Sequence, residues 1–334
     1  MTYVNYCLLV FIVVNFFFVV NFNKLLFFHY ILDKPDKKRK FHLKSMPLAG
    51  GIILIINLLI YFITIISNKE LLLSEVLFNS NLELYIFMTS AFIIFLIGLF
   101  DDKYDLTPNY KFLLLFIIIL STLLFDKNLL ISSINFSFYD EVINIGKFSL
   151  FFTVFCFLVF LNAFNMFDGI NLQASLYSII IICFILFFSS NSYLFKILLI
   201  YLIFFSYLNN KNKSFLGDSG TLLISFIISY VFIKLYNVGQ IKFVDEIFIF
   251  MMLPGIDLIR VFFKRFLNNK NPLRPDRTHL HHLLSEKFTH LQSLMIIQLI
   301  IITPIILSYL DINRLFIILA TIFCYSLIIY KLSK

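Results

Sequence analysis

The chain of 334 residues has no tryptophan, nine glycines and four cysteines, and charged residues make up only 14% of it. Charge this sparse excludes an ordinary soluble domain, in which about a quarter of the residues are charged. The cysteines lie in apolar stretches without paired spacing, which indicates neither a disulfide framework nor a zinc site. We expect them to be small packing residues. They are Cys7, Cys156, Cys183 and Cys324.

Long apolar runs take the place of the missing charge. Hydrophobic residues make up 60% of the chain, phenylalanine occurs 45 times, and the mean hydropathy is +0.94. Because a helix needs about 20 apolar residues to cross a bilayer, these runs predict about eleven transmembrane helices. The runs are residues 3–22, 48–67, 84–100, 110–125, 148–165, 173–190, 193–209, 220–237, 245–263, 292–310 and 314–331. The predicted fold is an all-α polytopic integral membrane protein with a single membrane domain over residues 1–334. We expect no cleaved signal, since no basic residue precedes the first run.

The positive charges are distributed unevenly between the loops. Alternate loops and the C-terminal tail hold about 20 of the 27 lysines and arginines, and such an excess marks the cytoplasmic side. The N-terminus is therefore expected outside and the C-terminus in the cytoplasm. The net charge of +8 arises from these loops, so we expect no nucleic acid as a partner. On the outer side, apolar and polar residues alternate over 134–138, which predicts a short external β-hairpin within 129–147.

Five polar motifs lie on the predicted cytoplasmic side. The first is a basic run that contains Lys34, Arg39 and His42, and Gly50-Gly51 follows it at the head of the next apolar run. On charge alone, such a run sets the topology and contacts anionic lipids. The paired glycines suggest a second role, because backbone N–H groups at a glycine-led helix start can approach a phosphate closely.

The second and third motifs contain carboxylates. Asp101 and Asp102 are adjacent at the membrane edge, where a shared divalent cation or proton would offset their repulsion. A solvated helix end is the alternative. Asn162, Asn165 and Asp168 are spaced by three, so on a helix they lie along one face. Such a stripe at membrane depth faces a ligand or a cavity, or else makes hydrogen bonds between helices.

The last two motifs are a glycine-flanked acid and a histidine loop. Asp218 lies between Gly217 and Gly220, a pattern that is as typical of a turn as of a ligand site. The histidines of the loop are not spaced to stack metal ligands on one helical face, so phosphate oxygens suit the loop better than zinc. Its chemically active residues are Arg277, His279, His281 and His282.

Together these motifs resemble those of the bacterial polyprenyl-phosphate N-acetylhexosamine-1-phosphate transferases. They occur in the family's order from Asp33 to His282, as Asp-x-Pro and Arg-Lys-x-His with Pro-x-x-Gly-Gly, Gly-x-x-Asp-Asp, Asn-x-x-Asn-x-x-Asp-Gly, Gly-Asp-x-Gly and His-x-His-His. The histidine loop is more similar to the N-acetylglucosamine branch than to the muramyl-pentapeptide branch. One departure is Asn171-Leu172, where many relatives have Asp-Gly, and it leaves the sugar open.

The resemblance implies a reaction and a site. A sugar 1-phosphate, expected to be N-acetylhexosamine 1-phosphate, passes from a UDP-sugar to polyprenyl (undecaprenyl) phosphate at the cytoplasmic face of the bacterial inner membrane, and UMP leaves. The implied cofactor is Mg²⁺, or Mn²⁺ in its place, with Asp218 and Asp101 as ligands. The implied catalytic residues are Asp101, Asp102 and Asp168. The implied substrate-binding residues are Lys34, Arg39, His42, Lys111, Asn162, Asn165, Arg277, His279, His281 and His282.

Several alternatives stay open at this point. The active site is expected in loops 23–47, 101–110, 166–172, 209–219 and 264–291. A one-step attack by the lipid phosphate needs mainly alignment and charge neutralisation, whereas the alternative is a covalent aspartyl-phosphate. The rival function is a transporter or lipid flippase, whose carboxylates would lie near the bilayer midplane rather than at one edge. A homodimer is compatible with the sequence, which does not decide the oligomeric state.

Overall fold

The computed structural model describes residues 3–33, 45–188, 192–269, 277–310 and 312–334, and helices make up most of this part of the chain. Each predicted apolar run falls on one long helix. The long helices are α1 (Tyr3–Asn21), α2 (Gly50–Ser67), α4 (Asn81–Tyr104), α5 (Pro108–Phe125), α6 (Ser149–Phe167), α7 (Gln173–Phe188), α8 (Tyr193–Asn210), α9 (Gly217–Asn237), α10 (Val244–Leu267), α12 (His290–Ser308) and α13 (Arg314–Ser333). The short helices are α3 (Lys69–Ser74), α11 (Leu280–Lys287) and the 3-10 turns η1 (Phe22–Lys24), η2 (Leu26–His29), η3 (Lys127–Leu129) and η4 (Gly146–Phe148).

Among the described residues, nine helices are long and apolar enough to cross a membrane. This confirms the all-α polytopic class. Two long helices fall outside that number: α7 offers a shorter apolar stretch, Gln173–Phe187, and α10 carries acidic residues in its first turn and basic residues in its last. The total of eleven crossings and their orientation stay predictions.

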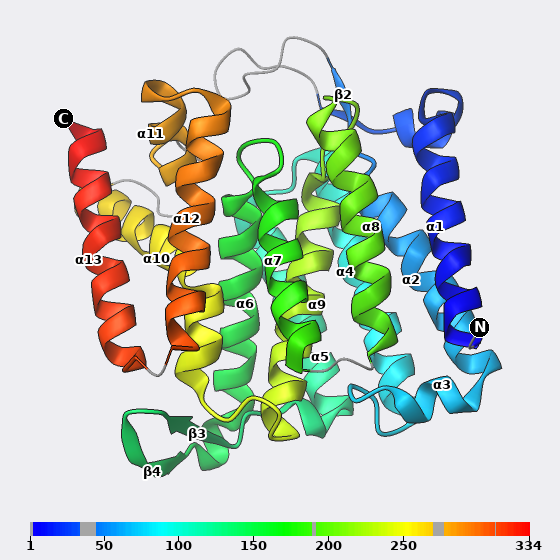
Figure 1. The fold of residues 1–334 in the computed structure, drawn as a ribbon, viewed down its shortest axis with the longest axis horizontal. Coiled ribbons are helices and arrows are strands. Elements are labelled where there is room, and N and C mark those ends of the chain that lie inside the picture. Colours follow the sequence, from blue (N-terminus) through cyan, green and yellow to red (C-terminus); the bar gives the residue numbers. More distant parts are fainter. Residues whose placement is uncertain (1–2, 34–44, 189–191, 270–276, 311) are drawn as a thin grey trace.

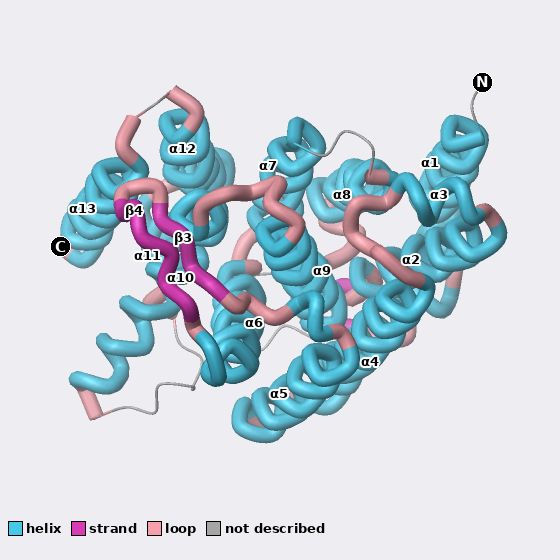
Figure 2. The backbone as a smooth tube through the Cα atoms, turned by 90° about the horizontal axis from the view of Figure 1, so that it is seen from below, coloured by secondary structure: helices cyan, strands magenta, loops and turns pink. Residues whose placement is uncertain are grey.

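Helix α9 lies at the centre of the bundle (Figure 2). It packs against α2, α4 and α6, and every residue from Ser219 to Leu235 is buried. A helix that is buried all round belongs to the core and has no stripe that faces lipid. The positions of its neighbours are therefore defined by their contacts with α9.

Glycines allow two neighbouring helices to approach α9 closely. A Cβ added to Gly98 of α4 would lie 2.6 Å from the backbone nitrogen of Ser219, and one added to Gly51 of α2 would lie 2.6 Å from that of Gly220. Even a methyl group does not fit in so little space, so glycine is required at both contacts. The first turn of α9 is thereby packed directly against the backbones of α2 and α4.

The glycine pair at the start of α2 does not have the free N–H groups that phosphate binding would need. The N–H of Gly50 donates to the carbonyl of Phe215 and that of Gly51 to the carbonyl of Leu216, each at 3.2 Å. The expectation that these groups face a phosphate is therefore wrong. They join α2 to the segment that precedes α9.

The two ends of the bundle differ. One end, called here the α11 end, carries α11 and a small antiparallel pair of strands, β1 (Leu32–Asp33) and β2 (Met46–Pro47), and the other, the hairpin end, carries β3 (Ser133–Phe136) and β4 (Tyr139–Asn144) (Figure 1). Strands β3 and β4 pair antiparallel, as predicted within 129–147. Burial does not alternate along them, however, because β4 is exposed over its whole length. The hairpin turn is held instead by Asp245, which accepts the N–H and the hydroxyl of Ser137 at 2.8 and 2.6 Å.

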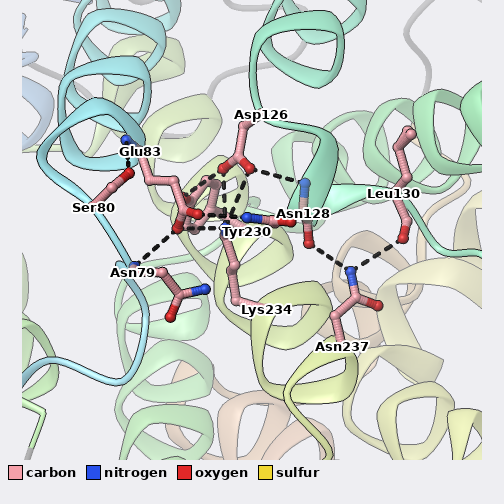
Figure 3. A network of polar contacts seen from close by, with 9 residues as sticks. All are labelled: Asn79, Ser80, Glu83, Asp126, Asn128, Leu130, Tyr230, Lys234 and Asn237. Atoms are coloured by element: carbon pink, nitrogen blue, oxygen red, sulfur yellow. Dashed lines mark hydrogen bonds and ion pairs between the residues drawn. The ribbon is translucent and has the colours of Figure 1, made fainter.

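A buried network of ions joins three helices at the hairpin end (Figure 3). Lys234 Nζ of α9 lies 2.8 Å from Glu83 of α4 and 3.0 Å from Asp126, which follows α5. Asn128 donates to Glu83 at 2.7 Å, and the hydroxyl of Tyr230 donates to Asp126 at 3.2 Å. Because buried charges must be paired, the network fixes the far end of α9 against α4 and α5.

Two predicted loop boundaries need correction at the α11 end. Helix α4 continues to Tyr104, so the acidic pair lies in its last turn and only residues 105–107 form the connection to α5. The predicted loop 264–291 likewise contains the end of α10 and all of α11. Both segments are more polar than a membrane span, and hydropathy alone cannot show that a helix continues beyond its apolar part.

Candidate active site

The short turn between α4 and α5 brings Asp101 to face Lys111. Asp105 ends α4 in the left-handed region, with φ 50°, and Pro108 opens α5. Proline suits the first position of a helix because its φ is already fixed near the helical value. The Oδ1 of Asp101 accepts the N–H of Leu106 at 2.8 Å, which holds the carboxylate over the turn.

Lys111 connects three of the predicted site residues. Its Nζ lies 2.6 Å from Asp101 Oδ2 and 2.5 Å from Asp218 Oδ2. In the amide orientation that matches donors with acceptors, Asn165 accepts from Lys111 at 2.8 Å and donates to Asp218 Oδ1 at 3.0 Å. All three ammonium protons therefore have acceptors. Helices α4, α5, α6 and α9 meet at this point.

Asp102 has a different environment from Asp101. Its Oδ1 accepts the N–H of Asp218 at 2.7 Å, and its Oδ2 accepts the N–H and the hydroxyl of Ser219 at 3.1 and 2.7 Å. The carboxylate thus caps α9, where unpaired N–H groups and the helix dipole favour negative charge. Gly217, with φ 73°, makes room, since a Cβ there would lie 2.7 Å from Asp102 Oδ2. The two adjacent acids therefore have different partners. Asp101 contacts the ammonium of Lys111, whereas Asp102 caps α9, the helix that carries Asp218.

Asp168 directly follows α6, at the end of the predicted polar stripe. Desolvation raises the pKa of its carboxyl to about 7, and the nearby charge of Asp218 contributes to the rise. No hydrogen bond from a described residue offsets these effects. A carboxyl group that has a pKa near neutral pH and lies beside other charged groups is typical of a functional site.

The histidine loop packs against the turn that follows Asp168. The ring of His281 lies so close to Gly169 that a Cβ at this position would collide with the imidazole. Burial lowers the pKa of His281 well below its ordinary value, and the neighbouring His282 and His279 add to the effect. His281 is therefore neutral at pH 7, and the loop is in direct contact with the turn next to the acidic cluster.

The residues at this site fit Mg²⁺. Mg²⁺ in phosphate-handling sites usually takes one or two protein carboxylates, and substrate phosphates and water complete its coordination. Asp101 and Asp218 already share one cation, the ammonium of Lys111, and they are the residues that would hold the metal ion. Within the described ranges, no group of three or more His, Cys, Asp or Glu side chains is arranged to hold a metal.

The remaining predicted residues lie in other surroundings or outside the described residues. Asn162 donates to the carbonyl of Leu158 on its own helix at 2.7 Å, and no contact in the described part of the chain joins it to the carboxylates. His279 lies 2.7 Å from Asp257. Arg277 and His282 belong to the same loop as His279 and His281. The residues outside the described ranges are Lys34, Arg39 and His42.

Sequence reasoning missed several residues that hold the site together. Ser219 bonds Asp102, and the hydroxyl of Thr221 lies 2.9 Å from the Asn165 amide, yet serine and threonine in an apolar helix give no clear signal. Asp257 could have been found, because an ionisable residue inside a predicted span is a functional candidate by default.

The fold and the site together define a class of protein. This is a polytopic helical protein in which two carboxylates share the ammonium of Lys111 at one end of the bundle. It has the features of an enzyme that acts on phosphates at a membrane surface.

Comparisons with known proteins narrow this class. Residues 84–236 match the model of glycosyl transferase family 4. The chain is 27% identical over 288 residues to the undecaprenyl-phosphate alpha-N-acetylglucosaminyl 1-phosphate transferase of Escherichia coli K12, an alignment that covers 80% of this chain and 73% of the relative. It is 28% identical over 281 residues to the probable undecaprenyl-phosphate N-acetylglucosaminyl 1-phosphate transferase of Bacillus subtilis, with 80% and 74% covered. The resemblance to this family that the motifs predict is confirmed by these matches.

Proposed function

We propose that this chain transfers N-acetylhexosamine 1-phosphate from a UDP-sugar to undecaprenyl phosphate and releases UMP. The observation that carries the proposal is the convergence of Asp101 and Asp218, from two helices, on one cation at the end of the bundle. Phosphoryl transfer depends mainly on alignment and on neutralising charge, which is what such a site offers. The activity named for the relatives supports the same reaction.

In this proposal Asp101 and Asp218 hold Mg²⁺, which would neutralise the donor diphosphate and stabilise the departing UMP. Lys111 adds positive charge between the same two carboxylates. Asp102 keeps Asp218 in position through the first N–H groups of α9. The excess of lysine and arginine on this side supports a site at the cytoplasmic face of the inner membrane, where the basic run 34–44 would attract the lipid phosphate.

The chemistry is a single displacement. An oxygen of the lipid phosphate attacks the β-phosphorus of the UDP-sugar, the new P–O bond forms, and the bond between the β-phosphorus and the bridging oxygen breaks to release UMP. A covalent route through Asp102 would first have to break the three hydrogen bonds that this carboxylate accepts from α9, which favours the single displacement. Asp168 is better suited to accept a proton, because its raised pKa makes it the stronger base.

The pKa of Asp168, about 7, predicts a pH dependence near neutrality. A proton acceptor works only when it is ionised, so kcat/KM should rise as the pH increases through about 7 and then level off. In Asp168→Asn this rise of kcat/KM with pH should be lost, and activity should fall by about 10²–10⁴-fold. The measurement is kcat/KM for the lipid phosphate over a pH series. If kcat/KM of the variant still rises with pH, the group that titrates is the lipid phosphate itself, whose second pKa is about 6.

The direct test is UMP release from purified protein in detergent, with a series of UDP-N-acetylhexosamines and with or without polyprenyl phosphate. We expect UMP only when the lipid, Mg²⁺ and the correct donor are all present. The donor series also identifies the sugar that Asn171-Leu172 leaves open. No lipid-dependent UMP release with any donor would overturn the proposal and return attention to the transporter or flippase, which needs no nucleotide cleavage.

A further inference from the structure

Four polar side chains converge behind the histidine loop. Asp257 and Arg260 come from α10, Tyr325 comes from α13, and His279 immediately precedes α11. Asp257 is 3% exposed, His279 5% and Tyr325 2%. Burial of this many polar groups is stable only when their hydrogen bonds are satisfied, so the way in which they are paired is informative.

Both oxygens of the Asp257 carboxylate face donors. Oδ1 lies 2.6 Å from the Tyr325 hydroxyl and 2.7 Å from the guanidinium of Arg260. Oδ2 lies 2.7 Å from Nδ1 of His279. The N–H of Leu280 donates to Oδ1 as well, at 3.2 Å. Asp257 is thus the common acceptor that links α10, α13 and the histidine loop.

These contacts fix the orientation of His279. Because Nδ1 faces a carboxylate oxygen, Nδ1 carries a proton, and Nε2 is the nitrogen directed away from Asp257. The guanidinium of Arg260 donates to the main-chain carbonyl of Thr278 at 2.6 Å, so the backbone next to the imidazole is held too. The ring and its main chain are therefore fixed by the same cluster.

The fixed imidazole is connected to the acidic site through its neighbour. The rings of His279 and His281 are parallel, with an interplanar angle of 1° and centroids 5.8 Å apart. His281 in turn lies against Gly169, the residue after Asp168. The Asp257 cluster thus supports one edge of the loop whose other edge contacts the α6–α7 turn.

We propose that Asp257, Arg260 and Tyr325 are positioning residues, which hold His279 so that its Nε2 is presented to the nucleotide-sugar donor. The inference rests on the proposed function, since the donor is taken from it. A carboxylate that fixes one ring nitrogen so that the other can meet a ligand is a general device in proteins, and loss of such a partner usually costs about 10–100-fold in affinity or activity.

Steady-state kinetics give the first test. Asp257→Asn should raise the KM for the UDP-sugar by about 10–100-fold, while the KM for the lipid phosphate stays unchanged. Tyr325→Phe removes one hydroxyl and should also raise the KM for the UDP-sugar, by a smaller factor. The matched control is Tyr330→Phe on the same helix, because Tyr330 is 57% exposed and lies outside the cluster. A lower melting temperature with normal kinetic constants in Asp257→Asn would reduce the cluster to a structural support and overturn the inference.

A double-mutant cycle tests whether Asp257 acts through His279. When His279→Ala has already removed the imidazole, Asp257→Asn should raise the donor KM no further. Effects that add in full would mean that the two residues act independently, and the positioning role would be refuted.

A spectroscopic measurement separates this inference from the proposed function. In protein labelled with ¹⁵N-histidine, the ring signals of His279, assigned with His279→Gln, should shift in Asp257→Asn and remain in place in Tyr330→Phe. Unchanged His279 signals in Asp257→Asn would overturn the inference whether or not the enzyme turns over. Shifted signals in a protein that releases no UMP would leave the orientation of His279 established and refute only the proposed reaction.

Discussion

Replacing Asp218 by asparagine is expected to lower kcat by about 10²–10³-fold or more, while the protein still inserts and folds. The substitution keeps the size of the side chain but removes one of the two carboxylates that share a cation with Lys111. Lys111 retains Asp101 as a partner at 2.6 Å, so the helix contacts should persist. UMP release measured over a Mg²⁺ titration should show both the lower rate and a weaker metal dependence.

The matched control for this variant is Asp105→Asn. Asp105 is an exposed carboxylate at the end of α4, in a left-handed conformation that asparagine also adopts well. Its substitution should leave the rate and the Mg²⁺ dependence as they are. Normal turnover with normal Mg²⁺ dependence in Asp218→Asn would exclude Asp218 as a metal ligand.

Adding a single methyl group at Gly98 is expected to displace the start of α9. The Cβ of Gly98→Ala would lie 2.6 Å from the backbone nitrogen of Ser219 and 2.7 Å from the carbonyl carbon of Asp218, and backbone cannot rotate away as a side chain can. Overpacking of this kind costs about 1–3 kcal/mol and sometimes more. Because Asp102 caps the same turn, the capping bonds and the position of Asp218 should be lost together. Thermal unfolding in detergent and UMP release should both show the defect.

Gly255→Ala is the control, because a Cβ at Gly255 in α10 would have no neighbour within 4 Å. We expect this variant to match the parent protein in melting temperature and in turnover. If Gly98→Ala behaved in the same way, the close approach of α4 to α9 would not be needed for the site.

The sequence predicted the helices well because each has its own local signal. An apolar run of about 20 residues reports one span regardless of its neighbours. The same runs do not show which helix is central: α9 and α13 are both apolar enough to cross a membrane, yet α9 is almost wholly buried and α13 mostly exposed. That difference depends on contacts between helices, such as those of Gly51 and Gly98, which hydropathy does not record.

The site was predicted in part. Motif order and charge asymmetry predicted that Asp101, Lys111 and Asp218 lie at one end of the bundle. In the structure these residues are in direct contact. Sequence could not separate Asp101 from Asp102, because their difference depends on which carboxylate points at the first turn of α9. Asp257 was missed because a single acid in an apolar run indicates only a break in the hydrophobic pattern, and its partners lie far away in the chain.

The central position of α9 has a consequence for biogenesis. In the part of the chain that the structure describes, every helix that supplies a partner to its polar ends precedes it: α2 and α4 provide the close contacts, α4 and the segment after α5 provide the acids around Lys234, and α6 provides Asn165. Membrane proteins are synthesised from the N-terminus, so these partners are already present when α9 emerges. A segment whose lysine would be costly to expose to lipid therefore enters the bilayer after the helices that pair with its polar groups.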